Sequence, residues 1–353
     1  MKFKTNFMKI GFYSEMQSLM MNQVFQDPNT LSGAGDDLLL PFVRLKEAGN
    51  QHRIEFSTVD TMPMNSFDAY LFCEMPAATN STLQEAKNSG KPCYLIVCEN
   101  HFLCKPNGEF ERYKDFDNVF TYNDEVVDGD QVIKLNYAFA LPKSISDAAE
   151  KKEKLAVMIC SNHKRDVKHL VYATRRETIN WFQDNHPEAF DLYGLGWGKG
   201  AFSFQTKPLL QRTLRRFGLL RLFPRKKYSS WRGKVARKRD VLGKYRFGFC
   251  YENTSEIPGY ITEKIFDVMM AGTVPVYLGP ENASTHIPEE CFIDRTKFPD
   301  HTSLYSYLSE MTETRYDEYL GAIHGFLSSE RSYEFSIDCF VDRILNTLIE
   351  GRR

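Results

Sequence analysis

The chain has 353 residues, a formal net charge of −1 at pH 7 and 42% hydrophobic residues. This length exceeds that of one typical domain, so we expect two domains with apolar cores. The near-neutral charge argues against a general nucleic-acid binder. No stretch approaches the ~20 apolar residues of a membrane span. The first residues lack the apolar segment of a signal peptide, so we expect none.

Eight cysteines are spread along the chain without a CxxC pair. Several lie in apolar, strand-like runs, where a free cysteine behaves as a small hydrophobic residue. We therefore expect a reducing compartment, the cytoplasm, and no zinc site.

The first 150 residues alternate short apolar runs with helical patterns, which predicts βαβ units and a parallel sheet. Asp36 or Asp37 is expected to cap the first helix. A charged run at 147–154 is typical of a linker, and an apolar strand begins at Leu155, so the boundary is expected near residue 150. The expected strands are 9–14, 54–59, 69–75 and 93–100, and the expected helices are 38–49 and 82–88.

The second domain, expected over 151–334, contains a strand–loop–helix–strand pattern. Phe247–Tyr251 predicts a strand, a helix is expected to start at Thr262, and Val274–Leu278 predicts the next strand. A helix N-terminus suits a phosphate, because its N–H groups are unpaired and its dipole end is positive. Lys264 opposes that dipole, which is easier to understand if an anion binds nearby. The alternative is a solvated Glu–Lys pair on a surface helix.

Further elements of the second domain are expected on both sides of this pattern. They are strands at 155–160 and 291–294, helices at 175–182, 303–311 and 316–327, and a C-terminal helix within 335–353 that packs back across the domains.

The segment 199–244 interleaves arginine and lysine with leucine and phenylalanine, and almost no acidic residue balances them. Such a basic amphipathic segment suits an anionic membrane surface. Nucleic acid could use the same charge. The alternative is a solvated or partly disordered insertion.

Three segments in order carry a resemblance to a known family: Tyr251-Glu252-Asn253, 260–264 (YITEK) and 272–279 (GTVPVYLG). They resemble the donor-binding signature of the α-1,3-fucosyltransferases, glycosyltransferase family 10, of the bacterial type. The resemblance implies an α/β fold of two Rossmann-like domains that face each other across a cleft, the GT-B arrangement.

The resemblance also implies an inverting transfer of L-fucose from GDP-fucose to a glycan hydroxyl. The acceptor would offer the 3- or 4-hydroxyl of GlcNAc or glucose, in a surface polysaccharide or lipopolysaccharide precursor. Glu99, in Cys98-Glu99-Asn100, would be the general base. The implied donor-binding residues are Arg175, Asn253, Tyr260, Glu263 and Lys264, and the further candidates are Glu252, Asn100, Thr262 and Arg176, the last as an alternative to Arg175.

No cofactor is implied, because GDP-fucose is a substrate and basic side chains can neutralise its diphosphate. No metal site is expected, although stimulation by a divalent cation stays open. The region Leu209–Arg239 predicts a peripheral contact of a cytoplasmic enzyme with the anionic inner membrane, and no nucleic acid is expected as a partner. Two alternatives remain: a transferase of this fold that uses another nucleotide sugar, and a non-catalytic basic adaptor for membrane or nucleic acid.

Overall fold

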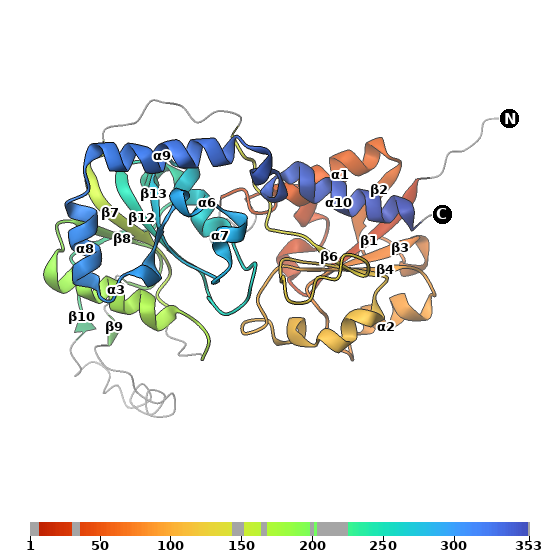
Figure 1. The fold of residues 1–353 in the computed structure, drawn as a ribbon. Helices are drawn as coiled ribbons and strands as arrows, with labels where there is room; N and C mark the ends of the chain where they lie inside the picture. Colours follow the sequence, from red (N-terminus) through yellow and green to blue (C-terminus); the bar gives the residue numbers. More distant parts are fainter. Residues whose placement is uncertain are drawn as a thin grey trace, which may run out of the picture.

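The computed structural model describes residues 7–29, 36–142, 152–163, 168–197, 201–202 and 225–351. Two six-stranded sheets, both entirely parallel and both flanked by helices, form two domains that lie side by side (Figure 1). The expected α/β fold of two Rossmann-like domains is confirmed. In the part of the chain that the structure describes, no helix combines the length and the hydropathy needed to cross a membrane.

The first sheet has the strand order β2-β1-β3-β4-β5-β6. Its strands are β1 (Met8–Ser14), β2 (Ile54–Thr58), β3 (Ala69–Cys73), β4 (Cys93–Val97), β5 (Asn118–Thr121) and β6 (Val132–Lys134), and its helices are α1 (Leu40–Gln51) and α2 (Ser81–Asn88). The edge strand β6 was not expected, because three residues are too short a run for a periodic pattern.

Both faces of this sheet are covered, which explains the nearly continuous apolar runs of its central strands. Leu71 of β3 packs into the core on the side of α1, while Tyr70 and Phe72 pack into the core on the side of α2. The expected cap of α1 by Asp36 or Asp37 is wrong. The N-cap position is Leu39, whose side chain makes no capping bond, and the helix starts with proline in its first turn.

The second sheet has the order β11-β8-β7-β12-β13-β14. Its strands are β7 (Lys154–Ile159), β8 (Phe190–Tyr193), β11 (Trp231–Gly233), β12 (Tyr245–Tyr251), β13 (Val274–Leu278) and β14 (Ile293–Asp294). Its helices are α3 (Tyr172–Asn185), α5 (Arg239–Leu242), α6 (Glu263–Met270), α7 (Ala283–His286), α8 (His301–Ser309) and α9 (Glu313–Leu327). A separate two-stranded pair joins β9 (Ala201–Phe202) to β10 (Arg225–Lys226).

Part of the basic segment 199–244 is built into this second domain. The strand β11 pairs with β8 at the edge of the sheet, and α5 precedes β12. Arg232 forms an ion pair with Asp191, whose side chain is almost fully buried. Residues 229–242 therefore belong to the folded second domain, although Arg232, Lys234 and Arg237 are exposed. Residues 203–224 lie outside the described residues.

The last helix, α10 (Ile337–Glu350), returns to the first domain and packs against α1 (Figure 1). The rings of Phe340 and Phe42 meet edge to face at 5.4 Å between centroids. The backbones of Phe139 and Ser336 form a bridge beside this crossing. The boundary near residue 150 stays a prediction, because residues 143–151 are not described. The chain passes between the two domains once before β7 and once before α10.

Candidate active site

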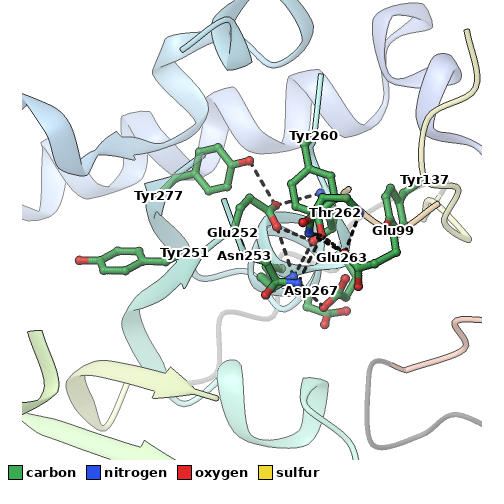
Figure 2. Close-up of polar contacts among 12 residues, drawn as sticks. Glu99, Tyr137, Tyr251, Glu252, Asn253, Tyr260, Thr262, Glu263, Asp267 and Tyr277 are labelled. Atoms are coloured by element: carbon green, nitrogen blue, oxygen red, sulfur yellow. Dashed lines mark hydrogen bonds and ion pairs between the residues drawn. The ribbon is translucent and has the colours of Figure 1, made fainter. Parts of the chain in front are cut away.

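A cavity of about 990 Å³ opens at the carboxyl ends of the strands, where the two domains meet. In open α/β sheets this edge is the usual position of a ligand. Figure 2 shows the polar side chains that gather there from both domains. The cavity is lined by Glu99, Arg175, Asn253, Tyr260, Glu263 and Lys264, together with Thr262. The structure thus brings together the residues that the sequence singled out, and their roles stay predictions.

Glu252, at the end of β12, is fully buried and anchors the start of α6. Its carboxylate accepts hydrogen bonds from the backbone N–H and the hydroxyl of Thr262 at 2.9 and 2.6 Å. The hydroxyl of Tyr277 donates to it at 3.2 Å. Glu252 therefore fixes the loop that carries the cavity-lining candidates and does not itself line the cavity.

Lys264 completes this anchor with its ammonium group. Its Nζ lies 3.2 Å from Glu252 and 3.4 Å from Glu263. Burial lowers the pKa of Lys264, but the two carboxylates outweigh burial and raise it above the ordinary value. The cation is therefore permanent at neutral pH. The alternative of a solvated surface pair is wrong, since the Lys264 side chain is 21% exposed and lines the cavity.

Glu263 has cations on two sides. Burial raises the pKa of this carboxyl, yet Lys264 and Lys238 overcome that effect and lower the pKa to about 2. Lys238 Nζ lies 3.5 Å from Glu263 and 2.8 Å from Asp267. A carboxylate held ionised at the rim of a cavity can accept hydrogen bonds from sugar hydroxyls.

Lys238 and Asp267 were missed as site residues, although both line the cavity. Asp267 follows Glu263 by four residues on α6, so the helical spacing places both on one face, and this signal was available. Nothing in the sequence distinguishes Lys238 from the other basic residues of its segment. Its position follows from the tertiary packing of α5 beside α6.

Arg175 lies on α3 with its guanidinium group under the end of β12. It is 7% exposed and donates to the backbone carbonyl of Glu252 at 2.7 Å and to Asn253 Oδ1 at 3.1 Å. Arg176 points elsewhere and donates to the carbonyl of His163 at 2.9 Å. Arg175, which lines the cavity, is therefore the better placed of the two arginines for a diphosphate.

Glu99 follows β4 in the first domain and faces the second. Its Oε1 accepts three hydrogen bonds, from the Asn100 backbone N–H at 2.8 Å, from Asn100 Nδ2 at 2.6 Å and from the Tyr260 hydroxyl at 2.9 Å. Asn253 Nδ2 donates to the same Tyr260 hydroxyl at 3.3 Å. These contacts link the candidate base to the loop after β12, and all three reach Oε1 rather than Oε2.

Burial raises the pKa of Glu99, and the hydrogen bonds from Asn100 and Tyr260 oppose this shift. A carboxylate with a raised pKa takes up a proton more readily than an ordinary one. This property, together with its position on the cavity wall, suits Glu99 to general-base work.

Metal-type ligands gather at one place in the described part of the chain. Donor atoms of Cys73, Glu74 and Cys98 lie within 4.8 Å of one another. The Glu74 oxygens already accept hydrogen bonds from two backbone N–H groups and from Asn107. We therefore assign no metal site there, and the expectation that the reaction needs no metal stays a prediction.

Comparison with known proteins finds similarity to the fucosyltransferases over part of the chain. Residues 220–323 match the model described as glycosyltransferase family 10 (fucosyltransferase) C-term. An α-(1,4)-fucosyltransferase of Arabidopsis thaliana is 32% identical over 81 residues, 22% of this chain and 20% of that protein. The α-(1,3)-fucosyltransferase FucT of Helicobacter pylori is 29% identical over 90 residues, 26% of this chain and 18% of that protein. The human α-(1,3)-fucosyltransferase 7 is 37% identical over 82 residues, 22% of this chain and 24% of that protein. The matches thus span about a fifth of these relatives.

Solved structures match over nearly the whole chain. A crystal structure of an α1,3-fucosyltransferase with GDP-fucose aligns with a TM-score of 0.55 and 14% identity, over 98% of this chain and 92% of that chain. Anabaena HepE in complex with UDP-glucose aligns with a TM-score of 0.54 and 12% identity, over 97% and 100%. At such identities the likeness shows the fold, which is GT-B. Over residues 220–323, this chain is similar to the C-terminal part of glycosyltransferase family 10, the fucosyltransferases.

Proposed function

We propose that this protein is an inverting α-1,3-fucosyltransferase that moves L-fucose from GDP-fucose to a glycan hydroxyl. One observation carries the proposal. Glu99 of the first domain is hydrogen-bonded to Tyr260, which lies inside the segment matched to the family, and both line one cavity with Lys264 and Arg175. A base and a cationic anion-binding site are thus held together.

The proposed reaction is a single displacement. The acceptor oxygen attacks C1 of fucose, and the bond from C1 to the phosphate oxygen breaks, so GDP leaves with the electron pair. Glu99 Oε2 takes the acceptor proton, which contributes about 10²–10⁴ in rate. Lys264 and Arg175 stabilise the negative charge that builds on the leaving diphosphate. Glu263 accepts hydrogen bonds from the ribose hydroxyls, and Asn253 and Tyr260 line the nucleotide pocket.

The acceptor offers the 3- or 4-hydroxyl of GlcNAc or glucose in a surface polysaccharide or lipopolysaccharide precursor. The names of the similar proteins, which specify α-(1,3) and α-(1,4) transfer, support these positions. The reaction needs no cofactor, and a divalent cation has at most a stimulating effect.

The enzyme is cytoplasmic in this proposal and touches the anionic inner membrane through the Leu209–Arg239 region. Its basic and apolar composition supports the contact. Arg232 and Lys238 are engaged in internal ion pairs, so the membrane contact falls to residues before them. Co-sedimentation with vesicles that contain anionic lipid tests this contact. The wild type should bind these vesicles, and Arg215→Glu/Arg221→Glu should bind them less. Neither protein should bind neutral vesicles.

The decisive experiment is calorimetric titration with GDP and, as the control, UDP, followed by fucose transfer from GDP-fucose to GlcNAc-terminated oligosaccharides. We expect binding of GDP alone, weakened in Lys264→Met, and formation of an α-linked product. Binding of UDP without GDP would overturn the donor and favour another nucleotide sugar, as the fold likeness to the UDP-glucose complex of HepE allows. Binding of neither would favour a non-catalytic adaptor.

A further inference from the structure

Glu74 is an acidic residue of the first domain that neither the sequence motifs nor the proposed reaction uses. It directly follows β3, which pairs with β4. Glu99 lies just after the end of β4. Its backbone has a φ of +68°. The left-handed region is unfavourable for a non-glycine residue, and such residues are often kept at functional sites. The cost calls for a compensating interaction.

The compensation lies in the contacts of the Glu74 carboxylate. Its Oε1 accepts the backbone N–H of Glu99 at 2.9 Å, and its Oε2 accepts that of Cys98 at 3.3 Å. Hydrogen bonds from backbone N–H groups to a carboxylate are stronger than bonds between neutral groups. The carboxylate thus holds the backbone of the candidate base where it leaves the sheet.

Asn107 closes the same network from the other side. It is 2% exposed, and its Nδ2 donates to Glu74 Oε2 at 2.5 Å and to the carbonyl of Glu99 at 2.8 Å. Its Oδ1 accepts the backbone N–H of Met75 at 2.9 Å, which fixes the orientation of the amide. The N–H of Glu99 is therefore bound by Glu74, and its carbonyl by Asn107.

We propose that Glu74 is a positioning residue, which holds the backbone of Glu99 so that its carboxylate meets Tyr260 and faces the cavity. The proposal rests on the proposed role of Glu99 as the general base. Glu74 itself is not among the residues that line the cavity. It acts through the backbone of its neighbour and touches no substrate.

The network requires a group that only accepts hydrogen bonds. Every partner of the Glu74 carboxylate is an N–H donor. In Glu74→Gln one oxygen becomes an NH₂ group that must face one of these donors. Asn107 cannot reverse its amide without losing its bonds to Met75 and to the Glu99 carbonyl. The substitution therefore releases one side of the Glu99 backbone.

The charge of Glu99 also acts on Glu74. Burial raises the pKa of Glu74 to about 7, against the hydrogen bonds that it accepts, and the charge of Glu99 adds to this rise. The charged groups that act on Glu99 are Lys264, which lowers its pKa, and Glu263, which raises it, both on α6. The phenols of Tyr122, Tyr137 and Tyr260 face it as well.

The test compares Glu74→Gln with Glu74→Asp, which keeps the charge but has a shorter reach. The control is Glu85→Gln on α2, an exposed carboxyl of the same domain. We expect kcat to fall about 10- to 100-fold in both Glu74 variants, with the KM for GDP-fucose within about twofold, because a displacement of 1 Å is enough for such a loss. The control should match the wild type.

Wild-type kcat in Glu74→Gln would overturn the proposal. A loss shared between kcat and KM would reduce Glu74 to a structural residue and overturn it too. If Glu74→Gln does not fold, the test rests on Glu74→Asp. A lower kcat with an unchanged KM in this variant would support the positioning role. If the wild type transfers no fucose, the proposed function fails. A crystal structure of Glu74→Gln then decides the positioning role alone, and an unmoved Glu99 carboxylate would overturn it.

Discussion

Carboxylates lie on both sides of the cavity, and their hydrogen-bond and ion-pair partners differ between the two domains. In the second domain Glu252 and Glu263 pair with Lys264, and Lys238 joins Glu263 to Asp267. In the first domain Glu74 and Glu99 accept hydrogen bonds from amides and a phenol. Within the described residues, no lysine or arginine forms an ion pair with either of them.

This difference in partners separates carboxylates that stay charged from carboxylates that can take up a proton. Lysines lower the pKa of Glu263 to about 2, so this carboxylate keeps its charge throughout the physiological range. Burial without a paired cation raises the pKa of Glu99, which favours acceptance of a proton. Asp267 departs from this division, because burial outweighs Lys238 and raises its pKa to about 6. Two neighbouring cations therefore outweigh burial at Glu263, whereas one does not at Asp267.

The largest effect is expected from removing the proton acceptor of the first domain. Glu99→Gln should lower kcat by about 10²–10⁴-fold, because the amide cannot take the acceptor proton. Calorimetric GDP affinity should stay within about twofold, since the proposed diphosphate contacts lie in the other domain. The wild-type kcat should fall as the pH drops and Glu99 is protonated, and the variant should lose this limb. A variant with wild-type kcat would exclude Glu99 as the base.

Removing a cation from the second domain tests the other half of the comparison. Lys264→Met leaves the buried Glu252 without its cation, so thermal or denaturant unfolding should show a loss of about 3–5 kcal/mol in stability. The KM for GDP-fucose should rise at the same time. In Lys264→Met/Glu252→Gln the stability should return, because the amide introduced by the second substitution is neutral and can donate to the Thr262 hydroxyl, while donor binding should stay weak. If donor binding returned as well, Lys264 would act only through folding.

The contact between the two domains is tested by Tyr260→Phe, which removes one hydrogen bond from Glu99 Oε1. That bond lowers the pKa of Glu99 against the effect of burial, so its loss should move the acid limb of kcat to higher pH. The loss of one hydrogen bond of about 1 kcal/mol corresponds to roughly fivefold in kcat. A limb that moved to lower pH would contradict the assignment of this pKa to Glu99.

The smallest effect is expected from Lys238→Met, which takes one of two cations from Glu263. The pKa of Glu263 should rise, and the KM for GDP-fucose should increase about fivefold, about 1 kcal/mol, with the increase growing as the pH falls. Arg237→Met, on an exposed side chain that lies 3.8 Å from Asp37, serves as the control. A KM that stays constant between neutral and acidic pH would show that Lys264 alone keeps Glu263 ionised.

The sequence predicted both sheets because their strands are short apolar runs at regular spacing. Glu99, at the end of β4, was singled out by the resemblance to the fucosyltransferases. The sequence also predicted the charged start of α6. It could not predict β6 or β11, since strands of three residues carry no periodic signal.

The contacts made by Lys238 and Glu74 depend on packing between segments far apart in the chain. The network around Glu74 joins residues separated by 24 to 33 positions, and no local rule selects one buried acid among many. The pairing of Lys238 with α6 crosses a further gap of 29 positions to Asp267. Tertiary structure was needed to find both.

The return of α10 to the first domain has a consequence for synthesis. The core of that domain includes Ile337, Ile344 and Leu348, which leave the ribosome after the entire second domain. Domains that are continuous in sequence can fold while the chain is still growing. In this chain, the apolar surface on α1 of the first domain stays uncovered until the second domain and α10 have been synthesised. We expect a nascent chain that stops before residue 335 to need a chaperone, although its second sheet is already complete.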